Sequence, residues 1–432
     1  MALFLVEGEA KLKRLISGLV LTMLMVNVLG LGFNVKPARS SPATITVPDD
    51  YSTIQAAINA ANPGDTIAVS SGTYHENVVV NKTVSLIGEN RNSTTIVGVV
   101  NSPIWEPVID VWADDVTISN LTVVNGGDGI HLAARRSKVV NCTAYGNSDG
   151  ITISKYSTYP GPCQNYLRNN LLFNNSYNLF LLGSWSLDDF INDIDTSNLV
   201  NGKPVYYLVN KHDITINPAT FPDAGYVAII NSTNVQISNF SFSNNSDGLL
   251  IAFSPNTLVE NIEARNNFNG ISVMCSPRTA IKNCSFSINT SGIFLYYSDN
   301  ATINGNSISN AYDGIYLISS NECVVYHNNF INNMKQVYLH ESVGAWDSGY
   351  PSGGNYWSDY NGTDMYSGPG QNLTGSDGLG DTPYTIDSTN VDHYPLMNPV
   401  IPEFPSTIAF PLFLLLLTLA ITIAYKKHSR MP

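Results

Sequence analysis

Short stretches of alternating apolar and polar residues recur along the chain at a constant spacing. One of them, "GIFL" at Gly292, has counterparts at Gly248, Gly270 and Gly314, and these glycines follow one another at intervals of 22 residues. Apolar residues at every second position predict strands rather than helices. We expect the following residues to point inward as one continuous column: Ile130, Leu132, Ile151, Ile153, Leu249, Ile251, Ile271, Val273, Ile293, Leu295, Ile315 and Leu317.

An asparagine lies nine residues before most glycines of this kind, which include Gly129 and Gly150 earlier in the chain. The set is Asn120, Asn141, Asn239, Asn261 and Asn283, whereas the repeat of Gly314 has Gly305 at this place. Apolar residues flank each asparagine, so one repeat contains about three short strands separated by bends. A repeat of this size cannot bury a core alone, and copies must stack. The pattern therefore predicts a parallel β-helix over residues 44–340, with the asparagines in a buried ladder at one bend.

Both ends of such a solenoid need a cap, because an open end exposes core and unpaired backbone. Before the first strands, Ser52 and Gln55 match a capping box, and Ile54, Ala57 and Ile58 share one helical face, which predicts a helical cap. Residues 341–398, rich in tryptophan and tyrosine, are predicted to form a C-terminal capping segment. Between about residues 155 and 230 the spacing breaks, which predicts loops or a strand excursion on the side of the solenoid.

The two ends of the chain carry apolar segments. Residues 1–39 have basic residues before an apolar run, as in a signal peptide or a signal anchor. Residues 407–425, within a tail at 399–432, are long and apolar enough for a transmembrane helix. Lys426, Lys427 and Arg430 follow it, so we expect a cytoplasmic C-terminus, unless the tail is removed, and a solenoid anchored at the outer face of the membrane.

The net charge bears on the kind of ligand, and the cysteines bear on burial and on disulfide bonds. The net charge is −13 with 13% charged residues, which excludes a nucleic-acid backbone as the expected ligand. Cys142 and Cys284 stand where other repeats carry Leu121, Phe240 or Ile262, so they are predicted to be small buried side chains. If the protein is exported to an oxidising compartment, a Cys142–Cys163 disulfide is an alternative interpretation of these cysteines.

Several segments resemble known families. "ITVPDDYSTIQAAINAANPGDTIAVSSGTYHENVVVNKTVSLIGE" resembles the start of right-handed β-helix proteins grouped with pectin lyases, and "NLVNGKPVYYLVN", "GNYWSDYNGTD" and "DGLGDTPYTID" resemble the NosD-type copper-processing family and its archaeal surface relatives. The resemblance implies an all-β fold, a single-stranded right-handed parallel β-helix of the pectin-lyase-like kind. "IPEFPSTIAFPLF" resembles a PEF-type sorting signal, which implies an archaeal surface protein and an archaeosortase as a partner.

The best catalytic constellation lies after two neighbouring bends. Asp128 and Asp149 precede glycines on adjacent repeats, where stacking would bring them about 5 Å apart. His131 and Lys155 are near neighbours, with Arg135 and Arg136 beside them. Paired carboxylates suit a polysaccharide lyase or hydrolase, but Asp-Gly is also ordinary turn chemistry, and Asp247 and Asp313 occupy the same place elsewhere. Both interpretations stay open.

The sequence suits two metals to different degrees. Asp364, Asp377 and Asp381 lie around glycines in the C-terminal segment, which suits calcium, with plain Asp-Gly turns as the alternative. Copper would need clustered methionine, cysteine or histidine. Met274 and Cys275, and Cys323 and His327, are close in sequence without forming such a motif, so we expect no copper site.

Aromatic residues gather on the outward positions of the later repeats. Between the inward residues stands a predicted outer column of His131, Thr152, Leu250, Ser272, Phe294, Tyr316 and Tyr338, with Met274, Tyr296, Ile318 and His340 two residues further on. Rings spaced by one repeat can stack on sugar faces, which makes Phe294, Tyr296, Tyr316 and Tyr338 candidate ligand-binding residues. The alternative is that residues 341–398 fold back and cover them.

These observations favour a surface protein that binds glycans or serves a structural or adhesive role in the cell envelope. A polysaccharide-cleaving enzyme and a NosD-like copper accessory protein are the alternatives. Glycosylation candidates for an exported chain are Asn81, Asn92, Asn231, Asn300, Asn361 and Asn372. The ladder asparagines that match the same motif are expected to be buried and unmodified.

Overall fold

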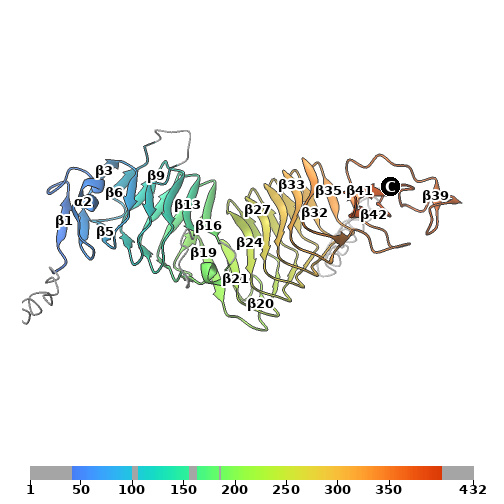
Figure 1. The fold of residues 1–432 in the computed structure, drawn as a ribbon, viewed down its shortest axis with the longest axis horizontal. Coiled ribbons are helices and arrows are strands. Elements are labelled where there is room, and N and C mark those ends of the chain that lie inside the picture. Colours follow the sequence, from blue (N-terminus) through green and yellow to red (C-terminus); the bar gives the residue numbers. More distant parts are fainter. Residues whose placement is uncertain (1–40, 100–105, 155–162, 184–185, 401–432) are drawn as a thin grey trace, which may run out of the picture. The chain divides into compact units, whose positions relative to one another are not determined.

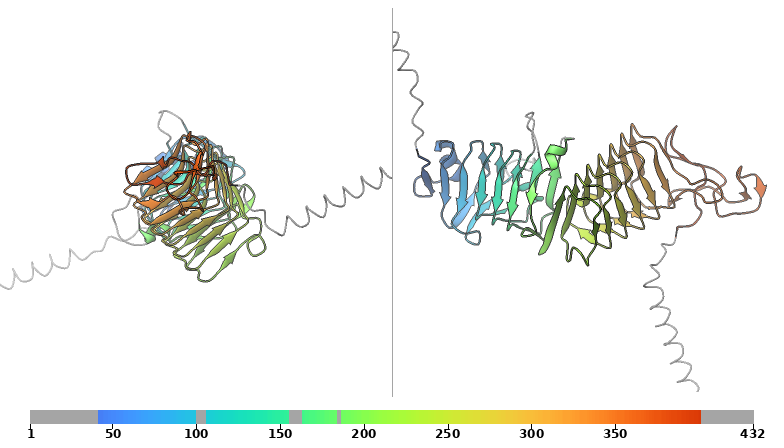
Figure 2. Two further views of the ribbon diagram at one scale, coloured as in Figure 1. Left: turned by 90° about the vertical axis from the view of Figure 1, so that its right-hand side faces the viewer. Right: turned by 90° about the horizontal axis from the view of Figure 1, so that it is seen from below.

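The computed structural model describes residues 41–99, 106–154, 163–183 and 186–400. The chain divides into residues 1–43 and a unit of residues 44–432, and the described fold is that of the second unit. Its strands are short and stack parallel to one another, turn upon turn (Figure 1, Figure 2). The predicted parallel β-helix is thereby confirmed.

Three sheets form the walls of the first part of the solenoid. The seven-stranded sheet contains β1 (Thr44–Val47), β2 (Thr66–Val69), β5 (Ser85–Gly88), β8 (Thr117–Ser119), β11 (Lys138–Val140), β14 (Tyr166–Arg168) and β17 (Asp193–Ile194). The five-stranded sheet contains β4 (Val78–Val80), β7 (Ile109–Val111), β10 (Asp128–Leu132), β13 (Asp149–Ser154) and β16 (Tyr177–Leu182). The third wall is the start of a thirteen-stranded sheet: β3 (Gly72–His75), β6 (Thr94–Val97), β9 (Thr122–Val124), β12 (Thr143–Tyr145), β15 (Leu171–Phe173) and β18 (Leu199–Val200).

The second part continues this last sheet and adds two new ones. The thirteen-stranded sheet goes on with β19 (Lys203–Val209), β21 (Tyr226–Ile230), β24 (Asp247–Ala252), β27 (Asn269–Met274), β30 (Ser291–Tyr296), β33 (Asp313–Ile318) and β36 (Lys335–His340). A second seven-stranded sheet contains β20 (Thr215–Ile216), β22 (Gln236–Ser238), β25 (Leu258–Glu260), β28 (Ala280–Lys282), β31 (Thr302–Asn304), β34 (Cys323–Tyr326) and β37 (Gly344–Ala345). A six-stranded sheet contains β23 (Ser241–Ser243), β26 (Glu263–Arg265), β29 (Ser285–Ser287), β32 (Ser307–Ser309), β35 (Asn329–Ile331) and β38 (Tyr356–Trp357).

An antiparallel hairpin joins the two parts. β18 pairs antiparallel with β19 across Asn201 and Gly202, which both have positive φ, and β19 then pairs parallel with β21. Because of this hairpin, the glycine-led strands β10 and β13 lie in the five-stranded sheet, whereas β24 and its successors lie in the thirteen-stranded sheet. The predicted inward residues are buried, but the expectation of one continuous column is wrong, since the pattern moves from one sheet to another at the hairpin.

β21 and β24 are buried on both faces. Ala228 and Leu250 belong to the hydrophobic core of the first part, while Val227 and Leu249, on the other face of the same strands, belong to the core of the second part. The two cores therefore share a wall. The outer face of the thirteen-stranded sheet becomes accessible further along, where Phe294 is half-buried and Tyr338 is 37% exposed.

The recurring glycines are required by the closeness of adjacent turns. A Cβ atom on Gly270 would clash with the carbonyl oxygen of Gly292 on the next turn and lie 2.6 Å from Cδ1 of Phe286. Gly129 meets the same obstacle, because a Cβ there would lie 2.6 Å from the carbonyl oxygen of Gly150. The spacing of glycines in the sequence is thus the spacing of turns in the stack.

The asparagine ladder differs from the prediction in its burial. Asn261 donates from Nδ2 to Oδ1 of Asn239 at 3.3 Å, so a ladder exists, but both side chains are exposed and both residues have positive φ. The buried ladder lies three residues before the glycines, where the Asn245 and Asn267 amides donate to Oδ1 of the next asparagine at 3.0 and 2.8 Å. Asparagine tolerates the left-handed backbone of the first bend, which turns its side chain outward.

Separate structures close the two ends. At the start, the helix α2 (Ile54–Ala60) buries Ile54, Ala57 and Ile58, and its N-cap is Thr53. The predicted Ser52–Gln55 capping box is wrong, because the Thr53 side chain and the Glu76 carboxylate accept the first helical amides and Gln55 hydrogen-bonds to Val79 instead.

At the other end, Trp357 stacks on Phe330 with ring centroids 4.3 Å apart and on Tyr384 at 4.2 Å. Two small hairpins follow: β39 (Tyr366–Ser367) with β40 (Leu373–Thr374), and β41 (Tyr384–Thr385) with β42 (Val391–Asp392).

In the part of the chain that the structure describes, no helix is long and apolar enough to cross a membrane. The predicted signal segment at 1–39, the transmembrane helix at 407–425 and the PEF-type motif lie outside the described residues. The remaining described helix is α3 (Leu187–Phe190), a single turn in the region where the sequence spacing breaks.

Candidate functional site

Two carboxyl groups lie side by side on neighbouring strands of the five-stranded sheet. Asp128 of β10 is in register with Asp149 of β13, as the shared position before glycine predicts. Burial raises the pKa of Asp149 to about 7, helped by the neighbouring Asp128, and one of its buried oxygens has no hydrogen-bond partner. Burial also raises the pKa of Asp128, although the hydroxyl of Thr152 donates to it. Both carboxyls are therefore protonated over a wider pH range than ordinary aspartates.

His131 connects two further residues on the same face. Its Nδ1 lies 2.8 Å from Oδ1 of Asp110 on β7, and its Nε2 lies 2.6 Å from Oγ of Ser154 on β13. The other oxygen of Asp110 accepts the indole N–H of Trp112 at 2.7 Å. Reasoning from sequence missed Asp110 and Ser154. Asp110 occupies the position of His131 one turn earlier. The turn of Asp110 lacks the glycine motif, so the repeat pattern in the sequence does not align the two residues.

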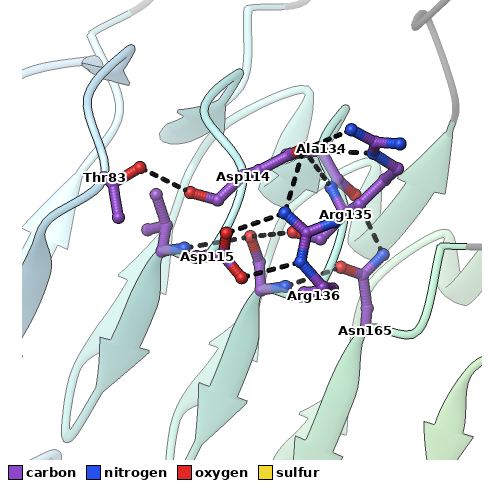
Figure 3. A network of polar contacts seen from close by, with 9 residues as sticks. Thr83, Asp114, Asp115, Ala134, Arg135, Arg136 and Asn165 are labelled. Atoms are coloured by element: carbon purple, nitrogen blue, oxygen red, sulfur yellow. Dashed lines mark hydrogen bonds and ion pairs between the residues drawn. The ribbon is translucent and has the colours of Figure 1, made fainter. Parts of the chain in front are cut away.

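The two arginines predicted beside this constellation form ion pairs at a bend between strands of the solenoid. Arg135 forms an ion pair with Asp114 at 2.7 Å, and Arg136 forms one with Asp115 at 2.7 Å, in a network that also contains Thr83 and Asn165 (Figure 3). These pairs join neighbouring turns. Lys155, the remaining candidate, lies outside the described residues.

A groove lies where β16 meets the outer face of the thirteen-stranded sheet. It has a cavity volume of about 290 Å³, and its lining is mainly apolar and aromatic. The residues that matter most are Phe180, Phe268, Met274, Phe294 and Tyr316, with Asp247 and Asp313 among them. Burial raises the pKa of both carboxyls, even though Ser272 and Asn269 donate hydrogen bonds to Asp247.

The predicted aromatic column forms one side of this groove and continues beyond it. The ring of Phe294 contacts Tyr316 at a centroid distance of 5.3 Å, and Tyr316 contacts Tyr338 at 4.6 Å, both edge to face. Tyr296 is buried against Tyr297 at the end of its strand. His131 and Thr152, which the sequence placed in the same column, belong to the five-stranded sheet. That part of the prediction is wrong because the hairpin intervenes.

The three candidate calcium ligands each bind backbone amides of their own loop. Asp364 accepts from the amides of Asp377 and Gly378, Asp377 accepts from Gly368 and Leu379, and Asp381 accepts from Met365 and Tyr366. Within the described ranges, no group of three or more histidine, cysteine, aspartate or glutamate side chains is placed to hold one metal ion. Calcium binding stays a prediction.

The soft residues weighed for copper have separate partners. Cys323 is buried with its thiol near the carbonyl oxygens of Ser298 and Ser320, whereas His327 binds the carbonyl oxygen of Ser352 at 2.8 Å. Cys142 and Cys284 are buried as predicted. Cys142 is a free cysteine, so the Cys142–Cys163 disulfide is not formed.

The candidate glycosylation sites lie on the surface. Exposed side chains are found at Asn81, Asn92, Asn231, Asn300, Asn361 and Asn372. Of the ladder asparagines that match the motif, Asn239 and Asn283 are exposed and Asn120 and Asn141 are half-buried, so the expectation that all four are buried is wrong.

Comparison with known proteins supports this fold. The family model described as "Periplasmic copper-binding protein (NosD)" matches residues 188–362. The parallel β-helix in this part of the chain is therefore similar to the NosD type. A cell surface glycoprotein of Methanothermus fervidus is 25% identical over 143 residues, which cover 32% of this chain and 23% of that protein. The chain thus spans about a quarter of the length of this relative, and the two matches indicate an extracellular or cell-surface location.

The chain is also similar to several solved structures. The A-module of the Azotobacter vinelandii mannuronan C-5 epimerase AlgE6 has a TM-score of 0.29 and 16% identity, covering 68% of this chain and 94% of the module. The pectin methylesterase PemA of Erwinia chrysanthemi has a TM-score of 0.28 and 11% identity, covering 60% of this chain and 82% of the enzyme. Similarities of this size say nothing about the activity of this chain.

Proposed function

We propose that this protein binds a glycan chain at the cell surface through the groove beside β16 and the aromatic column that leaves it. The observation that carries the proposal is the continuous row of Phe294, Tyr316 and Tyr338, whose rings touch one another while Tyr338 remains 37% exposed. A row of rings at the spacing of adjacent strands suits a polymer of flat-faced sugar units.

The surroundings of the rings support a sugar rather than a purely apolar ligand. Asp247, Asp313 and Asn269 line the groove beside the apolar residues. The raised pKa of the two carboxyls lets each donate as well as accept a hydrogen bond over a wider pH range, which matches the donor and acceptor pattern of sugar hydroxyls. Apolar walls with a few polar groups are the usual make-up of a small-molecule site.

The alternative to glycan binding is that residues 341–398 cover the aromatic column. Trp346 and Trp357 of that segment are buried in the core of the second part, and Trp357 stacks on Phe330 of β35, a strand of the six-stranded sheet. This placement caps the end of the solenoid. It supports the binding role of the column, because these tryptophans pack on the core and on the six-stranded sheet and not on Phe294, Tyr316 or Tyr338.

The test is a glycan array with the purified full chain, followed by calorimetry with any polysaccharide that binds. We expect Phe294→Ala and Tyr316→Ala each to weaken binding about tenfold, which corresponds to about 1.4 kcal/mol. The matched control is Tyr145→Ala, which removes an exposed tyrosine stacked on Phe173 at 5.3 Å on β12, outside the groove. Absence of any bound glycan, or equal loss in the control, would contradict the proposal.

A further inference from the structure

Three residues on adjacent strands of the five-stranded sheet form a chain of polar contacts that the glycan-binding role leaves unused. Asp110, His131 and Ser154 come from β7, β10 and β13, and the two contacts of the histidine ring use its two different nitrogens. The distances are 2.8 Å from Asp110 Oδ1 to Nδ1 and 2.6 Å from Nε2 to Ser154 Oγ. Both are within hydrogen-bonding range.

This arrangement has the connectivity that activates a serine hydroxyl. A carboxylate bound to Nδ1 fixes the tautomer in which Nε2 is unprotonated and can accept the serine proton. Asp110 is itself held in place, because Trp112 donates to its second oxygen at 2.7 Å. The strands also hold the group, since His131 is in register with Asp110 on one side and Thr152 on the other.

The site is screened from water yet has a solvent-facing side. The side chains of His131 and Asp110 are 12% and 18% exposed, and Ser154 is buried. Trp112 is 47% exposed, and its ring meets the imidazole edge to face at a centroid distance of 6.3 Å. An exposed indole beside the imidazole offers a flat surface for a sugar ring.

We propose that Ser154, His131 and Asp110 form an acyl-transfer site that hydrolyses carboxylic esters carried on neutral sugars. Ser154 would act as the nucleophile, His131 as the general base and acid, and Asp110 as a positioning residue. The neighbouring carboxyls Asp128 and Asp149 favour a neutral ester, because neither offers a positive charge that would hold a phosphate or a uronate, and the ionised fraction of each would repel such a group. The site is separate from the groove and does not rest on the glycan-binding proposal.

The reaction balances without any added oxidant, reductant or metal. Ser154 Oγ attacks the ester carbonyl carbon while its proton passes to Nε2 of His131. The tetrahedral intermediate then breaks its bond to the sugar oxygen, which takes the proton from His131 and leaves as an alcohol. Water attacks the acyl-serine, giving one proton to His131, which returns it to Ser154 as the carboxylic acid leaves.

The first experiment is covalent labelling of the purified full chain with a fluorophosphonate probe, with the modified peptide mapped by mass spectrometry. We expect label on Ser154, and a rate of labelling lowered about a hundredfold or more in His131→Gln. Ser154→Ala should carry no label at that peptide. The matched control is Ser352→Ala, because Ser352 also lies 3.2 Å from a histidine nitrogen, that of His327, and this variant should label like the wild type.

A second measurement separates catalysis from structure. Asp110→Asn should lower the maximal labelling rate while leaving the half-saturating probe concentration unchanged, since Asp110 is proposed to act only through His131. Acetylated xylan should release acetate with the wild type and not with Ser154→Ala, whereas methanol release from methyl-esterified pectin without acetate release would overturn the choice of substrate.

The melting temperature of each variant is recorded beside these rates. An unlabelled wild type that melts cooperatively, or a folded His131→Gln variant that labels at the wild-type rate, would overturn the site itself.

Discussion

At the scale of single residues, the two asparagine ladders show how burial separates similar side chains. Asn267 accepts from the Asn245 amide at 3.0 Å and donates its own amide to Asn289 at 2.8 Å, all in the interior. Asn261 makes a 3.3 Å contact with Asn239 at the surface, where water can replace it. A polar group costs free energy when it loses its partner in the interior and little when water is at hand.

We therefore expect Asn267→Ala to lower the free energy of unfolding by about 1–3 kcal/mol, because the buried amide of Asn245 loses its acceptor. The control is Asn261→Gly, since glycine accepts the positive φ of that position, and it should stay within about 0.5 kcal/mol of the wild type. Urea unfolding followed by circular dichroism measures both. A larger loss in the Asn261 variant would mean that the outer ladder holds the turns together.

At the scale of elements, each glycine-led strand is limited by the turn stacked on it. Gly270 is the second residue of β27, which is buried along its whole length, and it approaches the backbone of Gly292 so closely that no side chain fits. Gly72, in β3, differs, because an added Cβ would meet only Tyr74 at an ordinary 3.5 Å. The same residue type is thus required in one strand and replaceable in another.

Gly270→Ala should lower the free energy of unfolding by about 1–3 kcal/mol, as expected when a methyl group is forced into a filled interior. Gly72→Ala should leave it unchanged within about 0.5 kcal/mol. Thermal melting of the two variants beside the wild type makes the comparison. If both glycines proved equally replaceable, adjacent turns would have to be able to move apart without cost.

At the scale of the whole molecule, stability depends on carboxyls that lie far apart along the solenoid. Burial raises the pKa of Asp149 in the first part to about 7, and it raises the pKa of Asp392, which accepts from Asn355 and Trp357 near the C-terminal end, to about 7 as well. In the unfolded chain both would ionise near pH 4. The folded state therefore binds these protons more tightly than the unfolded state does.

Their contribution to stability is complete below about pH 4 and is lost as the pH rises through about 7. The melting temperature of the wild type should fall over this window, and Asp149→Asn, which stays neutral, should show a shallower fall. Melting curves recorded from pH 4 to pH 8 test this. A wild type whose melting temperature rises steadily over the same range would show that ionised carboxylates such as Asp114, whose pKa the paired Arg135 lowers, dominate instead.

The sequence by itself determined the repeating unit and its buried residues. Alternation of apolar positions is a local property, and a glycine at every turn marks where backbones touch, so strands, inward residues such as Ile271 and the parallel stacking follow from the chain alone. The register of Asp128 with Asp149 follows in the same way, because their positions before glycine are equivalent.

Only the tertiary structure decided which turns share a sheet and which residues meet across turns of unequal length. Asp128 and Asp149, paired across one turn, are 21 residues apart, but Asp149 and Tyr177, paired across the next, are 28 apart, and the hairpin of β18 and β19 then moves the pattern to another wall. Such differences in turn length add up along the chain and cannot be recognised from any short stretch of sequence. The contact of His131 with Ser154, and the groove that Phe180 forms with Phe294, exist because backbone hydrogen bonding between whole strands sets these offsets.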